Sequence, residues 1–161
     1  MGPYPSLDID VADEAGLRSV AARLAAMPLG GVTIGLTGPL GAGKTTLVRW
    51  LMDALSPGES VSSPTFTLLH DYRLPGGGRL EHWDLYRISS VPEELWEPQE
   101  PGVCRVIEWA DKFDELGEQL DLRIAIRFKN MDSPDEARLI CMTWRRECAL
   151  ASCFAEHMKE R

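Results

Sequence analysis

The feature that most constrains the fold of this chain is the glycine-rich run Gly38-Pro39-Leu40-Gly41-Ala42-Gly43-Lys44-Thr45. It fits the phosphate-binding pattern G-x-x-x-x-G-K-[ST] at every fixed position. The apolar run before it, residues 32–37, predicts a buried strand, and the amphipathic segment after it, residues 44–55, predicts a helix. Strand, loop and helix in this order form the context that the pattern requires. A chance Gly-rich helix start is therefore the less favoured interpretation.

The chemistry of such a loop is separable into three parts. Glycines let the backbone curl so that successive N–H groups point at phosphate oxygens, and the positive end of the helix dipole adds to that anion site. A lysine in the position of Lys44 neutralises the β- and γ-phosphates, and a hydroxyl in the position of Thr45 ligates Mg²⁺. The loop residues expected to contact the nucleotide are Gly38, Leu40, Gly41, Ala42, Gly43, Lys44 and Thr45.

The remaining elements alternate between helical and extended patterns. Residues 7–11 are extended, and residues 12–27 predict a helix whose apolar face holds Leu17, Val20, Ala21 and Leu24. Two hairpins are expected, one joining 66–72 to 80–85 through the turn at 75–78, and one joining 122–128 to 137–144 through a turn at 132–134. Between them lie a helical turn at 93–96, a strand at 103–107 and a short helix at 110–116. Residues 146–161 form a tail with helical spacing.

Two carboxylates stand where strands are predicted to end. Glu108 directly follows the apolar strand 103–107, and Asp84 lies in the second strand of the first hairpin. Ligands of open α/β sheets bind at the carboxyl ends of the strands, and Glu108 fits that description better than Asp84. A solvated loop carboxylate is an equal alternative for either residue. The loop 61–66 contains Thr65, whose hydroxyl could contact Mg²⁺ or the γ-phosphate or could simply belong to a turn before the strand.

Composition restricts the class of protein further. The chain has 161 residues, enough for one domain over residues 1–161, and 17 Lys and Arg against 25 Asp and Glu give a net charge of −8. This balance argues against strong direct nucleic-acid binding, which needs cations for phosphate contacts. No signal peptide or membrane span is expected, and four cysteines without a metal-binding spacing indicate reduced thiols, so we expect a cytoplasmic protein.

Four short stretches follow one another along residues 7–144: residues 38–46, Ser-Pro-Thr-Phe at 63–66, His-x-Asp-Leu-Tyr-Arg at 82–87, and Ile-Glu-Trp at 107–109. Together they resemble the TsaE (YjeE) family, small bacterial P-loop ATPases needed to make threonylcarbamoyladenosine in tRNA. The last three stretches are weak signals when taken singly, whereas four in order are specific. Pro39 departs from the family, which often has an acidic residue there, and the tail at 146–161 lies beyond the matched core.

The resemblance, together with the element pattern, implies a P-loop NTPase-like three-layer α/β sandwich with a mixed, largely parallel central sheet and antiparallel terminal strands. It implies catalytic roles for Lys44, Asp84 and Glu108, with Thr45 and Glu108 on Mg²⁺ and Asp84 near the γ-phosphate or the attacking water. Thr46 and Thr65 join the ATP-binding set, the Thr65 loop acting as a nucleotide switch. It also implies docking on a TsaB–TsaD complex, and Arg138 would match a family arginine near the nucleotide.

Three functions stay open at this point. A weak, partner-dependent ATPase leads, because the sequence has no obvious arginine finger of its own. A small-molecule P-loop kinase is the second, against which stands the absence of an Arg-rich lid segment after the central strands. A non-hydrolysing nucleotide switch is the third.

Overall fold

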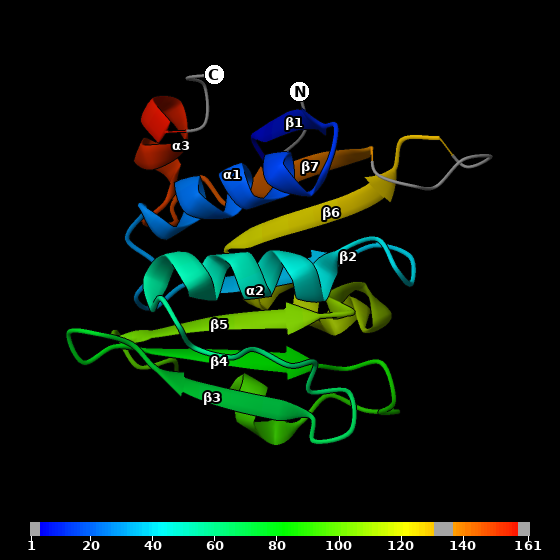
Figure 1. Ribbon diagram of the computed structural model, residues 1–161. Coiled ribbons are helices and arrows are strands. Elements are labelled where there is room, and N and C mark those ends of the chain that lie inside the picture. The colour runs from blue at the N-terminus through cyan, green and yellow to red at the C-terminus, as the bar shows by residue number, and fades with distance from the viewer. Residues whose placement is uncertain (1–3, 131–136, 158–161) are drawn as a thin grey trace.

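A mixed sheet forms the centre of the computed structural model, which describes residues 4–130 and 137–157. Over these ranges the strand order is β1-β7-β6-β2-β5-β4-β3. The four central strands β6, β2, β5 and β4 run parallel, and β1, β7 and β3 pair antiparallel with their neighbours (Figure 1). The strands are β1 Ser6–Val11, β2 Thr33–Thr37, β3 Leu69–Arg73, β4 Arg79–Asp84, β5 Val103–Glu108, β6 Leu122–Phe128 and β7 Arg138–Trp144.

Two helices cover one face of this sheet. They are α1, Glu14–Ala25, and α2, Lys44–Leu55. The four apolar residues that the spacing assigns to one face of the first helix are the ones that α1 buries. The Asp13 side chain caps α1 by accepting from the Gly16 N–H at 2.9 Å. The buried apolar side chains of both helices and Ile34 and Leu36 of β2 belong to the same, larger apolar core.

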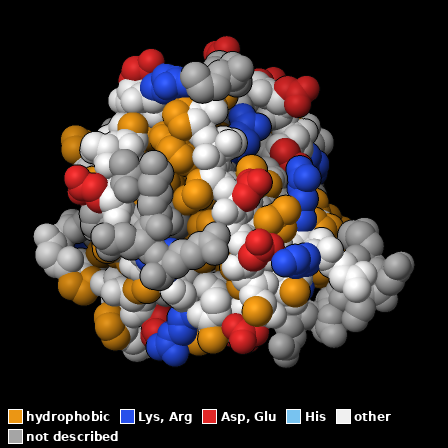
Figure 2. All heavy atoms as spheres, turned by 90° about the horizontal axis from the view of Figure 1, so that it is seen from above, with side chains coloured by type: hydrophobic (Ala, Val, Ile, Leu, Met, Phe, Trp, Pro, Cys, Tyr) orange, Lys and Arg blue, Asp and Glu red, His pale blue; other side chains and the backbone are white. Residues whose placement is uncertain are grey.

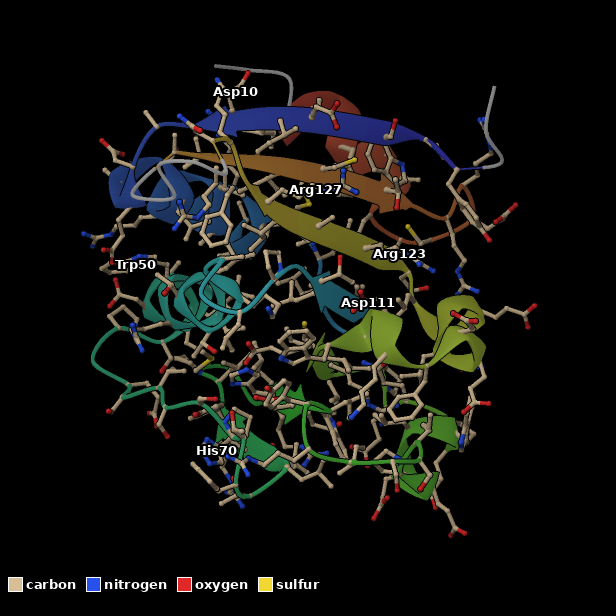
Figure 3. All side chains as sticks on the ribbon, turned by 90° about the vertical axis from the view of Figure 1, so that its right-hand side faces the viewer. Asp10, Trp50, His70, Asp111, Arg123 and Arg127 are labelled. Carbon is tan, nitrogen blue, oxygen red and sulfur yellow. The ribbon has the colours of Figure 1, made fainter. Side chains whose placement is uncertain are left out.

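The other face is covered by three 3₁₀ segments: η1 Glu93–Trp96, η2 Ala110–Lys112 and η3 Asp114–Gln119. Figure 3 shows the layers edge-on, with Trp50 of α2 on one side of the sheet and Asp111 of η2 on the other. A side chain at Gly35 would collide with this layer, because a Cβ there would lie 2.6 Å from Leu120 Cδ1 and 2.9 Å from Ala110 Cβ. The missing side chain thus lets the 3₁₀ layer approach the centre of the sheet.

After β7 the described part of the chain contains α3, Ala151–His157, which lies in the tail whose spacing predicts a helix. Phe154 of α3 stacks on Trp144 of β7 with ring centroids 4.0 Å apart. A groove of about 340 Å³ lies beside this pair and reaches Pro5 and Leu7 at the start of β1. Figure 2, which views the molecule from this side, shows hydrophobic side chains running through the middle of the face, with charged ones around them.

Most of the expected elements are confirmed, including the α/β class, the mixed sheet and both hairpins. The short helix expected at 110–116 is wrong, since these residues divide between η2 and η3. The strand expected from residue 66 begins only at Leu69, because the N–H groups of Thr67 and Leu68 turn back onto the Pro64 carbonyl. The turn expected at 132–134 lies outside the described residues. In the described part of the chain, no helix is long and apolar enough to cross a membrane.

Candidate functional site

A cleft of about 400 Å³ opens where the parallel strands end. The loop after β2, the start of α2, the loop before β3 and the ends of β4 and β5 surround it. This is the edge at which open α/β sheets bind ligands. Its lining residues are Leu40, Gly41, Gly43, Lys44, Thr45, Thr46, Ser63, Thr65, Phe66, Asp84, Tyr86, Arg87, Glu108 and Trp109.

The glycine-rich loop adopts backbone angles that require glycine. Gly38 has φ +143° and Gly43 has φ +114°, both in the region that residues with a side chain avoid. A Cβ at Gly38 would also lie 2.3 Å from the Ile126 carbonyl oxygen of β6. The loop therefore curls tightly against the sheet, and α2 begins directly after it at Lys44.

The Lys44 ammonium lies at the centre of this loop. Its Nζ donates to the carbonyl oxygens of Gly38 at 2.6 Å and Pro39 at 3.0 Å, and lies 4.0 Å from the centre of the Trp109 ring. Burial lowers the pKa of Lys44, and the carboxylates of Glu108, Asp111 and Asp84 oppose that shift. The site thus holds a cation that gains from any additional negative charge.

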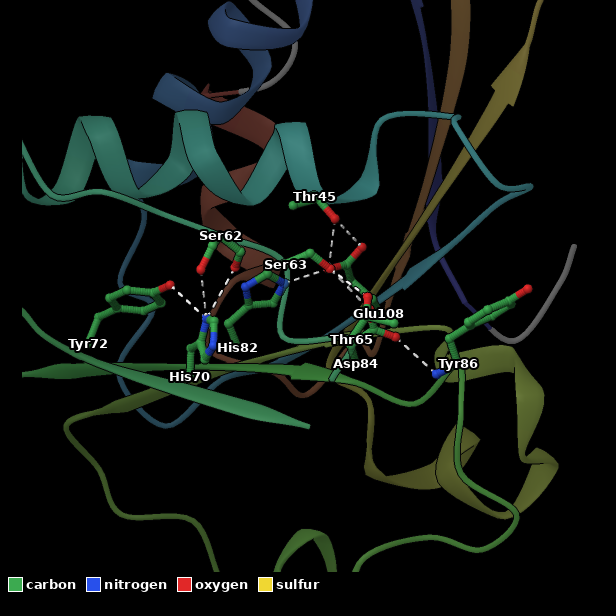
Figure 4. A network of polar contacts seen from close by, with 10 residues as sticks. All are labelled: Thr45, Ser62, Ser63, Thr65, His70, Tyr72, His82, Asp84, Tyr86 and Glu108. Carbon is green, nitrogen blue, oxygen red and sulfur yellow. Dashed lines mark hydrogen bonds and ion pairs between the residues drawn. The ribbon is translucent and has the colours of Figure 1, made fainter. Parts of the chain in front are cut away.

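Glu108, at the end of β5, is the acceptor for two side chains. Thr45 Oγ1 donates to it, 2.9 Å from Oε1 and 3.1 Å from Oε2. His82 Nε2 lies 2.6 Å from Oε2 (Figure 4). Glu108 is only 2% exposed, so the alternative of a solvated loop carboxylate is wrong for this residue. A buried carboxylate and a helix-start hydroxyl are thereby held in contact.

Asp84 lies beside Glu108, since the parallel register pairs these two residues directly. It is 4% exposed, so the solvated alternative is wrong here too. Its Oδ2 accepts from Thr65 Oγ1 at 2.6 Å and from Ser63 Oγ at 3.4 Å, and its Oδ1 accepts from the Tyr86 N–H at 2.9 Å. Asp84 therefore ties the loop before β3 to the cleft.

The structure brings most of the expected site residues together in this cleft, namely Leu40, Gly41, Gly43, Lys44, Thr45, Thr46, Thr65, Asp84 and Glu108. Gly38 and Ala42 lie outside the lining. Gly38 supports Lys44 through its carbonyl, and the Ala42 carbonyl accepts from Arg138 Nε at 2.9 Å. A second hollow, of about 200 Å³, adjoins the loop between the start of α1 and Arg138 and is also lined by Ala42 and Thr46.

Two contacts of the site are not indicated by the sequence motifs. One is the contact of the Trp109 ring with the Lys44 ammonium, and Trp109 has a left-handed backbone conformation at φ 61°. The other is the hydrogen bond between Nε2 of the buried His82 and Glu108 Oε2 at 2.6 Å. The spacing of His82 and Asp84, two residues apart on one strand, was the available signal, because it places both on the same face.

The parallel strands, the curled loop between β2 and α2, and the hydroxyl–carboxylate contact define a fold of the P-loop NTPase class. The chain's similarity to known proteins is more specific. The family described as "Threonylcarbamoyl adenosine biosynthesis protein TsaE" matches residues 11–139.

Among individual relatives, the tRNA threonylcarbamoyladenosine biosynthesis protein TsaE of Streptomyces coelicolor is 37% identical over 79% of this chain and 89% of its own length. That of Haemophilus influenzae is 35% identical over 68% of each chain. The crystal structure of YdiB from Bacillus subtilis aligns with a TM-score of 0.73 at 28% identity, covering 99% of this chain and 100% of that one. The chain belongs to the TsaE family, whose role is the biosynthesis of threonylcarbamoyladenosine in tRNA.

Proposed function

We propose that this chain binds ATP with Mg²⁺ in the cleft and hydrolyses it slowly, as the partner-dependent ATPase subunit of tRNA threonylcarbamoyladenosine synthesis. The observation that carries this proposal is the contact of Thr45 Oγ1 with Glu108 at 2.9 Å, beside the Lys44 ammonium and at the start of α2. A phosphate-binding loop, a cation and a hydroxyl–carboxylate pair are the parts that phosphoryl transfer needs.

The oxygen atoms of Thr45 and Glu108 suit Mg²⁺. This ion prefers hard oxygen ligands and commonly takes only one or two from the protein, the rest being phosphate oxygens and waters. Thr45 and Glu108 would hold it, since their oxygen atoms already lie 2.9 and 3.1 Å apart. When bound, Mg²⁺ neutralises charge on the phosphates.

The chain's own groups divide the remaining work. The loop N–H groups and the start of α2 bind the phosphate oxygens, and Lys44 leaves the loop carbonyls to neutralise the β- and γ-phosphates. Asp84 orients the water that attacks the γ-phosphate in line. The Thr65 hydroxyl donates its only hydrogen to Asp84 at 2.6 Å, so it must turn away from Asp84 before it can donate to a phosphate oxygen, and this gives the loop two positions.

The nucleoside would extend past Thr46 into the second hollow. That hollow is lined by Thr46 and Arg138, and it shares Gly41, Gly43 and Thr46 with the lining of the cleft. The carboxylates of Asp13 and Glu14 at its edge could accept from ribose hydroxyls or a base amine. Adenine is favoured over guanine because the sequence has no Asn-Lys-x-Asp tetrapeptide.

The partner is a complex of the TsaB–TsaD type, in the cytoplasm. Apolar side chains at the cleft support a partner there, since Leu40 is 73% and Phe66 84% exposed. The net charge of −8 favours a protein partner over direct contact with tRNA.

Titration calorimetry with ATP tests binding, and phosphate release with no added acceptor tests hydrolysis. We expect Lys44→Ala to lose ATP binding and Glu108→Ala to lose hydrolysis, whereas wild-type affinity in Lys44→Ala would refute the site. Phosphate transfer only to an added small molecule would indicate a kinase. Hydrolysis that is already absent in the wild type, with or without partners, would indicate a switch. A pull-down with TsaB and TsaD, with and without ATP, tests the partner.

A further inference from the structure

A fully buried histidine in β4 has no task in the function proposed above. His82 is 0% exposed and does not line the cleft, so it cannot touch a nucleotide there. Its Nε2 nevertheless lies 2.6 Å from Glu108 Oε2, and the Glu108 side chain is 3% exposed. Among the described residues, the hydrogen bond to Glu108 is therefore the polar link between His82 and the cleft.

The direction of this hydrogen bond follows from the groups involved. An ionised carboxylate only accepts, so His82 Nε2 must carry the proton and donate. The other ring nitrogen, Nδ1, is buried and has no hydrogen-bond partner among the described residues. The neutral tautomer protonated at Nε2 matches this arrangement, because it leaves only a lone pair without a partner and no buried N–H.

The strand register explains why the contact exists. Asp84 and Glu108 pair across β4 and β5, and His82 lies two residues before Asp84 on the same face. Glu108 is thus approached by His82 from β4 and by Thr45 from α2, both at its carboxylate oxygens. With His82 on Oε2, the carboxylate cannot rotate without losing a buried hydrogen bond.

We propose that His82 is a positioning residue, which fixes the orientation of Glu108 so that the carboxylate and the Thr45 hydroxyl face the metal together. This inference rests on the proposed function in one respect, the role of Glu108 toward Mg²⁺. Partners of this kind orient metal-binding side chains at many sites, and their removal lowers metal affinity or activity by about tenfold to a hundredfold.

The hydrogen bond itself is testable without nucleotide or metal. In protein labelled with ¹⁵N-histidine, we expect His82 to show a protonated Nε2 that is protected from exchange, and Glu108→Ala to abolish that protection. His70, paired with His82 across β3 and β4, serves as the internal control, because it is only half-buried and its Nδ1 contacts Ser62 and Tyr72. An unprotonated or freely exchanging Nε2 in the wild type would overturn the proposal.

A pair of variants tests the consequence. His82→Gln can place an amide N–H near the position of Nε2, whereas His82→Met has similar length and no donor. With a nonhydrolysable ATP analogue, we expect His82→Met to need about tenfold more Mg²⁺ for half-saturation, with unchanged affinity in EDTA, and His82→Gln to stay within about threefold of wild type. If the Met variant does not fold, His82→Asn replaces it, since its shorter amide falls short of Glu108.

Two results would refute the role. One is a Met variant with the wild-type Mg²⁺ requirement, and the other is a Gln variant as impaired as Met, which would mean that ring shape matters and the donor does not. In the Glu108→Gln background, His82→Met should add little further loss. If the wild type itself showed no Mg²⁺-dependent binding, the proposed function would fail, and the NMR measurement would still decide the hydrogen bond.

Discussion

Removing the Thr65 hydroxyl should loosen the loop before β3 by a measurable amount. In Thr65→Val the hydrogen bond to Asp84 Oδ2 at 2.6 Å disappears, and Oδ2 keeps only the longer contact to Ser63 at 3.4 Å. A hydrogen bond to a charged group contributes about 1.5–3 kcal/mol when buried. Because Thr65 is half-buried and water can replace part of the bond, we expect a loss of about 1 kcal/mol in the free energy of unfolding.

For a chain of this size, such a loss lowers the melting temperature by about 2–4 °C. Thermal unfolding followed by circular dichroism measures it, with Thr67→Val as the matched control, since Thr67 lies exposed in the same loop. Thr65→Ser keeps the hydroxyl and should melt close to wild type. The reasoning is refuted if Thr65→Val melts within about 1 °C of the Thr67 variant. Calorimetry adds a second measurement, in which Thr65→Val should lose any preference for ATP over ADP.

Three further perturbations follow from the structure. Between the lowered pKa of Lys44 and 10.5, the folded chain binds fewer protons at this residue than the unfolded chain, so Lys44 adds stability as the pH rises. We therefore expect the free energy of unfolding of the wild type to rise with pH relative to that of Lys44→Met, and equal slopes in parallel urea titrations in alkaline buffers would contradict this. Burial raises the pKa of Cys104 to about 12, so at pH 8 only about one Cys104 thiol in ten thousand is ionised. Iodoacetamide should therefore leave Cys104 unmodified until urea unfolds the chain, and mass spectrometry measures the modification. Gly35→Ala should lower the free energy of unfolding by about 1–3 kcal/mol, because the added methyl group collides with Leu120 and Ala110. An unchanged urea midpoint would contradict this, since it would mean that the 3₁₀ layer moves aside at no cost in stability.

The fold was largely predictable because its signals are local. The glycine-rich run with its flanking strand and helix specifies β2 and α2, and the apolar spacing of residues 17–24 specifies the buried face of α1. The segment 110–119 was not predictable in the same way. Its short apolar repeats fit an α-helix as well as they fit two 3₁₀ turns, and the choice depends on packing against Gly35.

The sequence predicts which residues form the site better than it predicts the contacts between them. Lys44, Thr45, Asp84 and Glu108 stand in recognisable motifs, and all four reach the cleft. The contact between His82 and Glu108 depends on two strands pairing in parallel with one particular register, which a single sequence does not display. The ring of Trp109 contacts Lys44 from a residue with a positive φ, a backbone conformation that is uncommon outside glycine and that the neighbouring residues do not predict.

The pairing of β4 with β5 has a consequence for how this protein can change over time. Because alternate residues of a strand face opposite sides, inserting or deleting one residue before Asp84 within β4 would turn its carboxylate toward the 3₁₀ layer and bring an apolar neighbour into the cleft. The turn at 74–78 carries no such restriction, since it lies at the opposite end of the strand. We therefore expect natural length variation to accumulate in that turn and to be absent from the six residues of β4.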